Sequence, residues 1–291
     1  MIFVDGIGVG LDDPEVNPCC YSTTGIFYPG QIHLPHGGAF FPLDARMGVP
    51  GLPQSATGQT AIYTGLNAPE IIGRHLYGFP NRELRQLLQR DSLFIRLGKH
   101  GYKCKFINAF RPVFFTTPEV FSDRPLSVTT EMNRFAGLDF CDFEEIRAGR
   151  ALYHDFTNSE ILDKGFDVPA CSAQTAAQIL VSESHKYDLL LYEYFLTDLA
   201  GHRGNLHSGI AEVVKVENLI QALLEKLDLE QTSLLVVSDH GNLENMGTKS
   251  HTMNPAYFAV WDLFLKSAKL RFHTLADVAP FIYHKITGLR D

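Results

Sequence analysis

The sequence YDLLLYEYF, residues 187–195, gives the strongest strand signal in the chain, and the polar motif TDLAGHRG follows it at residues 197–204. A continuous apolar run of this kind is typical of a strand buried on both faces of a sheet. Two similar runs, SLLVVS at residues 233–238 and MIFV at residues 1–4, also end at polar residues. Buried strands that alternate with helical segments predict an α/β fold, with a mostly parallel central sheet and helices on both faces.

The segments around these three runs complete the prediction. Further strands are expected at residues 102–108 and 256–261, and residues 11–54, rich in proline and glycine, are expected to be mostly loop. Periodic apolar residues and terminal glycines predict helices over 55–65, 82–100, 173–185, 207–227 and 274–286.

Residues 109–171 differ in character from the rest of the chain. They are dense in phenylalanine, arginine and acidic residues, and their apolar periodicity is weak. We therefore expect a catalytic core built from residues 1–108 and 172–291, with 109–171 inserted as a small cap or subdomain.

Composition excludes several classes of protein. The chain of 291 residues carries a net charge of −8, which disfavours a broad nucleic-acid surface. No apolar run reaches the length of a membrane span, and no secretory signal is visible, so we expect a cytoplasmic protein with no membrane partner. The five cysteines lack CxxC spacing, which favours reduced thiols over a disulfide framework. Nothing in the sequence indicates the oligomeric state.

Carboxylate and imidazole side chains gather where the predicted strands end. Ligands of α/β sheets collect beyond the carboxyl ends of the strands, so residues at these positions are expected to converge. A spacing of DxxxH also places both side chains on one side of a helical turn. Singly, each residue has an ordinary explanation as a cap, turn or surface group, but together they fit metal ligation better. The candidates are Asp5, Asp198, His202, Asp239, His240 and His251.

Five motifs in order carry a resemblance to a known family: DGIGVG, QSATGQTAIYTG, TDLAGHRG, SDHGNLENM and SHTMNP. Together they resemble the alkaline phosphatase superfamily, and most closely its branch of cofactor-independent phosphoglycerate mutases and phosphopentomutases. The resemblance covers residues 1–108 and 172–291. It implies a metalloenzyme with two divalent ions that share a catalytic nucleophile.

The resemblance also implies a role for each residue. One ion would take Asp198, His202 and His251, and the other would take Asp5, Ser55, Asp239 and His240. Imidazole and carboxylate ligands without thiolate suit zinc or manganese.

The nucleophile lies among three hydroxyls of the segment SATGQT. In the family it stands ten residues before the glycine that closes the helix, and counting back from Gly65 gives Ser55. Thr57 and Thr60 are expected to have capping or turn roles. A helix N-terminus and a bound cation both favour ionisation of Ser55.

A phosphate group on the substrate would need cationic partners. The candidates are Arg74, which follows the predicted nucleophile helix, and Arg111 and His154 in the insert. The insert holds only about sixty residues. It is therefore much smaller than the second domain that grips the substrate in phosphoglycerate mutases of the family.

These features lead to an expectation about activity. We expect a two-metal phosphomonoesterase that acts on a small phosphorylated substrate through a phosphoserine intermediate. The alternatives are a phosphomutase, a phosphodiesterase and a metal-binding module without catalytic activity. The segments CxPxR, SxPxR and TxPN, which mark sulfatases and nucleotide phosphodiesterases, are absent from the nucleophile region.

Overall fold

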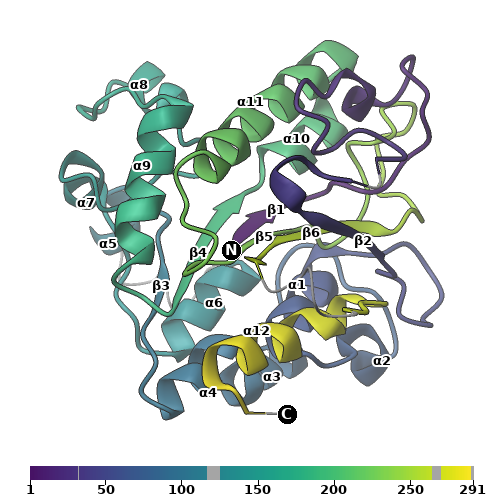
Figure 1. Cartoon of the computed structure of the whole chain (residues 1–291). Coiled ribbons are helices and arrows are strands. Elements are labelled where there is room, and N and C mark those ends of the chain that lie inside the picture. Colours follow the sequence, from purple (N-terminus) through teal and green to yellow (C-terminus); the bar gives the residue numbers. More distant parts are fainter. Residues whose placement is uncertain (32, 117–124, 264–269, 290–291) are drawn as a thin grey trace.

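The computed structural model describes residues 1–291 apart from 32, 117–124, 264–269 and 290–291. In this part of the chain one sheet of six strands runs through the middle of the molecule, in the order β2-β6-β5-β1-β4-β3 (Figure 1). The strands are β1 (Ile2–Val4), β2 (Ala39–Leu43), β3 (Cys104–Phe106), β4 (Leu189–Tyr194), β5 (Leu234–Val237) and β6 (Ala256–Trp261).

The sheet is mostly parallel, as the sequence predicts. Strand β1 pairs in parallel with β4 and β5, and β4 pairs in parallel with β3. Strand β6 is antiparallel to both of its neighbours, β5 and β2, so β2 runs in the same direction as β1. The carboxyl ends of β1, β4 and β5, the three strongest strand predictions, therefore meet at one edge.

Helices cover both faces of the sheet. One face packs against α9 (Ala173–Ser184) and α11 (Leu206–Leu224), and α10 (Leu196–Arg203) lies beside α11 (Figure 1). The other face is covered by α1 (Ser55–Thr64), α3 (Arg82–Asp91), α4 (Leu93–Lys99), α6 (Val128–Phe135) and α12 (Val278–Thr287). The short α2 (Ala68–Ile72) packs beside α1.

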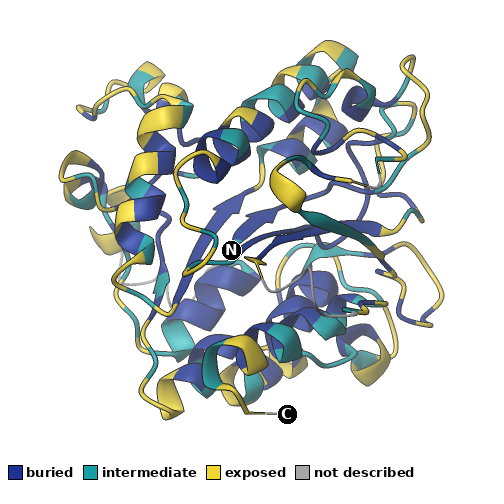
Figure 2. Ribbon diagram, viewed as in Figure 1, coloured by how far each residue is buried: buried dark blue, intermediate teal, exposed yellow. Residues whose placement is uncertain are grey.

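Alternation along the strands explains the two layers. In β1, Ile2 and Val4 join the core under α9 and α11, whereas Phe3 joins the core under α1 and α12. Successive strand side chains point to opposite faces, so an unbroken apolar run supplies both cores. Strands β1, β4, β5 and β6 are accordingly buried along their whole length (Figure 2).

Two elements differ from the sequence prediction. Strand β2 lies inside the stretch predicted as loop, where Pro42 and the adjacent Gly37 and Gly38 hid a strand at the edge of the sheet. The predicted helix 82–100 is two helices, α3 and α4, because Ser92 between them has an extended backbone with ψ 151°.

The residues of the insert pack against both layers. Helix α6 contacts α3 and α4 and adds Val128 and Met132 to the core that contains α1. Helices α7 (Phe143–Arg147) and α8 (Ser159–Asp163) supply Phe143 and Ile161 to the opposite core. A further short helix of the insert is α5 (Val113–Thr116). The division into a core and an inserted cap stays a proposal.

Two further findings concern membranes and thiols. Within the described residues, no helix combines the length and apolarity that crossing a bilayer demands. All five cysteines are free, with Cys19, Cys104 and Cys141 buried.

Candidate active site

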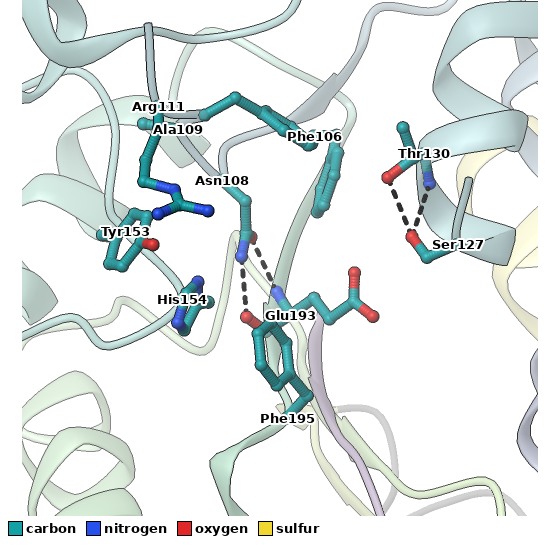
Figure 3. A pocket seen from close by; sticks show the side chains of 11 residues that line it. Phe106, Asn108, Ala109, Arg111, Ser127, Thr130, Tyr153, His154, Glu193 and Phe195 are labelled. Carbon is teal, nitrogen blue, oxygen red and sulfur yellow. Dashed lines mark hydrogen bonds between the residues drawn. The ribbon is translucent and has the colours of Figure 1, made fainter. Parts of the chain in front are cut away.

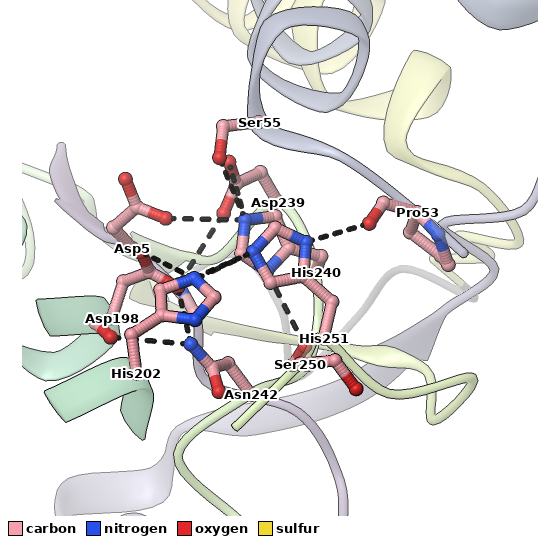
Figure 4. A network of polar contacts seen from close by, with 12 residues as sticks. Asp5, Pro53, Ser55, Asp198, His202, Asp239, His240, Asn242, Ser250 and His251 are labelled. Carbon is pink, nitrogen blue, oxygen red and sulfur yellow. Dashed lines mark hydrogen bonds and ion pairs between the residues drawn. The ribbon is translucent and has the colours of Figure 1, made fainter. Parts of the chain in front are cut away.

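The ends of β1 and β5 place three of the predicted ligands beside one another. Asp5 directly follows β1, and Asp239 and His240 follow β5 after Ser238. Because β1 and β5 are parallel neighbours, their carboxyl ends lie together. The Nε2 atom of His240 lies 3.3 Å from Oδ1 of Asp5 and 3.5 Å from Oδ2 of Asp239 (Figure 4).

Helix α10 and the loop before β6 carry the other three predicted ligands to the same place. Asp198 and His202 stand one turn apart on α10, and the His202 Nε2 lies 3.4 Å from Oδ2 of Asp198. His251 comes from the loop that precedes β6, with its Nε2 3.7 Å from Oδ1 of Asp198 and 3.1 Å from the His202 Nε2. The rings of His240 and His251 stack at 3.7 Å between centroids, which joins the two groups.

Ser55 is the first residue of α1 and faces this cluster. Its Oγ lies 2.9 Å from the His240 Nε2 (Figure 4). Helix α1 ends at Gly65 in the left-handed conformation, with φ 77°, as the helix prediction from its terminal glycine requires. The N-terminal position points the positive end of the helix dipole at any charge that develops on Ser55.

The two threonines of the same segment have structural roles. Thr57 donates its hydroxyl to the carbonyl of Gln54 and accepts from the backbone of Leu76. Thr60 donates to the carbonyl of Ala56 one turn earlier. Both side chains are fully buried, so Ser55 is the hydroxyl of this segment that faces the ligand cluster.

The backbone fixes the tautomers of two histidines. Nδ1 of His251 lies 2.8 Å from the carbonyl of Pro53, and Nδ1 of His202 lies 2.7 Å from the carbonyl of Lys249. A carbonyl only accepts, so in each ring the proton is on Nδ1 and the neutral ring has a lone pair on Nε2. In the neutral rings the two lone pairs face one another at 3.1 Å, an arrangement that a cation between or beside them stabilises.

Several carboxyl and imidazole groups of the cluster have strongly shifted pKa values. Burial, with the neighbouring Asp239 and Asp198, raises the pKa of Asp5 well above its usual range, and burial also raises the pKa of Asp239. Burial alone would lower the pKa of His240, but Asp239, Asp5 and Asp198 outweigh it and raise this pKa to about 10. Burial and the nearby His240 lower the pKa of His251 to about 4.

The donor set fits divalent metal ions. Two overlapping groups have ligand atoms within 4.8 Å of one another, Asp198 with His240 and His251, and Asp5 with Asp239 and His240. Oδ1 of Asp5 is buried and lies 3.3 Å from the His240 Nε2, with no other hydrogen-bond partner among the described residues. Buried carboxylates that repel one another and imidazole nitrogens that face one another are both relieved by cations. The assignment of particular residues to one ion or the other stays a proposal.

Two supporting residues with amide side chains were missed by the sequence prediction although they stand inside its motifs. Gln59, one turn after Ser55, donates to Asp5 at 3.3 Å and to Asp239 at 3.2 Å. Asn242 donates to Oδ1 of Asp198 at 2.6 Å. Their positions in QSATGQ and DHGN were the available signal, but nothing in the sequence shows where their amides point.

Glu244 connects the loops that carry the ligands. Its buried carboxylate accepts from the backbone of Gly8 at 2.9 Å and of Asn242 at 2.8 Å, from the Asn254 amide at 2.9 Å and from the hydroxyl of Thr252. These partners come from the segments after β1 and β5 and from the loop before β6. A single side chain therefore ties together the three loops that hold Asp5, His240 and His251.

Two cavities lie next to each other at this edge of the sheet. The Ser55 cavity, about 410 Å³, is lined by Ser55, Asp5, Asp198 and His202 and has Tyr77 and Phe79 at its rim. The Arg111 cavity, about 270 Å³, lies against the insert (Figure 3). Ser127, Glu193 and Phe195 line both cavities.

The three predicted substrate contacts have different surroundings. Arg111 and His154 line the Arg111 cavity (Figure 3). Arg74 is exposed and lines neither cavity. The structure therefore brings two of these three residues toward the site and leaves Arg74 outside it.

Comparison with known sequences identifies related proteins. Residues 161–288 match the model of a family described as the metalloenzyme superfamily. The 2,3-bisphosphoglycerate-independent phosphoglycerate mutase of Moorella thermoacetica is 31% identical over 39% of this chain and 23% of that enzyme. The enzyme of the same name from Myxococcus xanthus is 28% identical over 72% of this chain and 46% of its own length. The chain thus spans less than half the length of these relatives.

Solved structures extend the likeness to the whole chain at the level of fold. The PH0037 protein of Pyrococcus horikoshii aligns over 100% of this chain and 98% of its own, with a TM-score of 0.59 and 12% identity. The alkaline phosphatase of the Antarctic bacterium TAB5 aligns over 99% of this chain and 97% of its own, with a TM-score of 0.56 and 13% identity. Residues 161–288 are thus similar to the metalloenzyme superfamily, the sequence is similar to 2,3-bisphosphoglycerate-independent phosphoglycerate mutases, and the fold is that of the TAB5 alkaline phosphatase.

Proposed function

We propose that this protein hydrolyses phosphate monoesters, with Ser55 as the nucleophile and two divalent ions, zinc or manganese, as cofactors. The observation that carries the proposal is the position of the Ser55 Oγ, at a helix N-terminus and 2.9 Å from the His240 Nε2, inside the ring of carboxylates and imidazoles. A nucleophile at a preformed cation site is the arrangement that phosphoryl transfer requires.

The proposed ligand sets follow the resemblance of the motifs. Asp198, His202 and His251 would hold one ion, and Asp5, Ser55, Asp239 and His240 would hold the other. Bound there, the ions would supply Lewis-acid stabilisation of the attacking and leaving oxygens. The Nδ1 contacts of His202 and His251 with backbone carbonyls keep the Nε2 lone pairs directed at the cluster.

The chain's own residues would carry two transfers. The Ser55 Oγ attacks phosphorus, the ester P–O bond breaks, and the alcohol leaves with a proton while phospho-Ser55 forms. Water then attacks phospho-Ser55, the bond between phosphorus and Oγ breaks, and inorganic phosphate leaves. The dipole of α1 favours negative charge on the Ser55 Oγ in both steps.

Exposure at the site favours water as the acceptor. Tyr77 at the rim of the Ser55 cavity is 69% exposed and Phe79 is 50% exposed. A mutase has to retain its dephosphorylated product and exclude water until the phosphoryl group returns. The open rim supports hydrolysis.

A phosphomutase is the second candidate, and the named relatives favour it. Both matched enzymes carry the name of phosphoglycerate mutase. This chain spans less than half the length of each enzyme, so we propose mutase activity only as the alternative.

The fate of the phosphoryl group decides between the two. Metal-loaded protein is incubated with a panel of labelled phosphate monoesters and diesters, and the label is followed. We expect release as inorganic phosphate from monoesters. Transfer of the label to another hydroxyl of the same substrate would contradict hydrolysis and favour the mutase.

A serine variant tests the nucleophile in the same assay. Ser55→Ala should lower kcat by roughly 10³-fold or more, because the nucleophile and its activating groups act as one unit. Metal content should remain, since six other ligands are unchanged. Ser182→Ala, at an exposed position on α9, is the matched control and should retain activity.

A further inference from the structure

The Arg111 cavity offers a place for the part of the substrate that is not phosphate. A phosphoryl group at Ser55 would lie in the Ser55 cavity, and Glu193 and Phe195 belong to the walls of both cavities. An alcohol bonded to that phosphoryl group can therefore extend past Phe195 into the neighbouring space (Figure 3). This inference rests on the proposed function.

Aromatic rings dominate one wall of the cavity. The rings of Tyr153 and His154 lie 3.9 Å apart between centroids, and those of His154 and Phe195 lie 4.3 Å apart with an interplanar angle of 32°. Phe106 and Phe110, in edge contact at 6.1 Å, line the cavity as well. A column of rings that ends at the shared wall favours a flat, unsaturated ligand group.

One cation of the cavity is available to a ligand. The Arg111 guanidinium extends between Tyr153 and Asn108 into the space (Figure 3). Among the residues that the structure describes, no carboxylate forms an ion pair with it, whereas Arg134, Arg147 and Arg150 of the same insert each pair with a glutamate.

The neighbouring polar groups are already engaged. The Asn108 amide is held by the backbone of Glu193 at 2.7 and 2.9 Å. The His154 Nε2 lies 2.6 Å from Glu160. The Glu193 carboxylate points toward Ser127, away from Arg111 (Figure 3). An anionic substituent on the ligand is therefore best met by Arg111, in a charge-assisted hydrogen bond.

We propose that the Arg111 cavity binds the alcohol portion of the phosphate ester, and that this portion is an aromatic group with a carboxylate that pairs with Arg111. The phosphate and the carboxylate are then at opposite ends of a flat spacer. The aromatic column selects the spacer, and Arg111 selects its charge. An ester of a small aliphatic alcohol uses neither feature.

Two esters that differ by one carboxylate test how much this charge contributes to turnover. Benzyl phosphate and 4-carboxybenzyl phosphate have leaving alcohols of similar reactivity, because the methylene separates the ring from the reacting oxygen. We expect kcat/KM to be roughly ten- to a hundredfold higher for the carboxylated ester. Arg111→Gln should abolish this preference, so that the variant turns over the two esters with equal kcat/KM. Arg147→Gln is the control, since Arg147 pairs with Glu144 on the surface, and it should preserve the preference.

Binding of the free alcohol tests the cavity without catalysis. Titration of the metal-loaded protein with 4-(hydroxymethyl)benzoate, followed by calorimetry, should show binding that Arg111→Gln weakens at least about tenfold and Arg147→Gln leaves unchanged. If no ester is turned over but this binding is found, the proposed function falls and the binding site stands. Equal turnover of the two esters, with no effect of Arg111→Gln on turnover or on binding, would overturn the inference and leave the hydrolase intact.

Discussion

At the scale of single residues, the site depends on where protons are held. The His202 and His251 rings donate from Nδ1 to backbone carbonyls, so the neutral form of each ring has its lone pair on Nε2, and the two Nε2 atoms lie 3.1 Å apart. His240, surrounded by carboxylates, instead keeps its proton in the metal-free protein, with a pKa of about 10. A cation that binds to His240 therefore has to displace a proton.

Metal binding should release protons at neutral pH. The raised pKa values of His240, Asp5 and Asp239 mean that metal-free protein holds protons that its metal-bound form cannot hold. We expect a release of about one proton or more per chain at pH 8, seen as a dependence of the calorimetric enthalpy on the ionisation enthalpy of the buffer. The same enthalpy in all buffers would mean that His240 is no ligand.

Glu244 should matter for metal affinity although it lies outside the proposed ligand set. Each carboxylate oxygen of Glu244 accepts two hydrogen bonds, and Glu244→Gln replaces one of these oxygens by an amide group that can only donate. The change should cost about 2–4 kcal/mol of unfolding free energy. Metal affinity should fall because the three ligand loops lose their common anchor. Glu225→Gln, at an exposed residue after α11, is the control. Wild-type metal affinity in Glu244→Gln would show that the loops are positioned by other contacts.

At the scale of elements, the strands and their ends were the predictable part. The runs 1–4, 187–195 and 233–238 contain β1, β4 and β5, because central strands need apolar residues on both faces. Strand β2 was not predicted, since its pairing with β6 depends on tertiary contacts rather than on its own pattern. The break at Ser92 was missed for a similar reason, because the apolar spacing continues across it.

Close packing of α10 gives a test with a matched pair of glycines. A Cβ at Gly201, between Asp198 and His202 on α10, would lie 2.6 Å from the Asn242 amide. Gly201→Ala should therefore displace Asn242 from Asp198 and lower metal affinity. At Gly98 on α4 a Cβ meets nothing within 4 Å, so Gly98→Ala should raise stability by about 0.5–1 kcal/mol through helix propensity. Equal metal affinity in the two variants would contradict the packing account of α10.

The buried Glu193 on β4 should make the stability of the metal-free protein depend on pH. Burial raises the pKa of Glu193 from 4.5 to about 7, so the folded state binds this proton more tightly than the unfolded state. The unfolding free energy should then fall as pH rises from about 4.5 to about 7, and the penalty should be complete above that range. Glu193→Gln removes the penalty and should be more stable than wild type at pH 8, by thermal unfolding. An identical pH profile in the two proteins would show that Glu193 is ionised normally.

At the scale of the whole molecule, the site is made by topology. Asp5 and Asp239 are 234 positions apart in sequence and meet because β1 and β5 are neighbouring parallel strands. Motif order and strand ends were enough to predict this convergence. The residues that line the cavities were harder to predict from the sequence. Arg111 and His154 line a cavity because of how the insert packs, which their local sequence pattern does not show, and Arg74 lines neither cavity.

In the proposed reaction Ser55 takes up the phosphoryl group. The direct measurement is acid quenching of the metal-loaded enzyme during turnover of a phosphate monoester, followed by peptide mass spectrometry. We expect a peptide containing Ser55 that carries one phosphoryl group during turnover and loses it when the substrate is exhausted. A phosphoryl group on another residue, or undiminished turnover by Ser55→Ala, would contradict it.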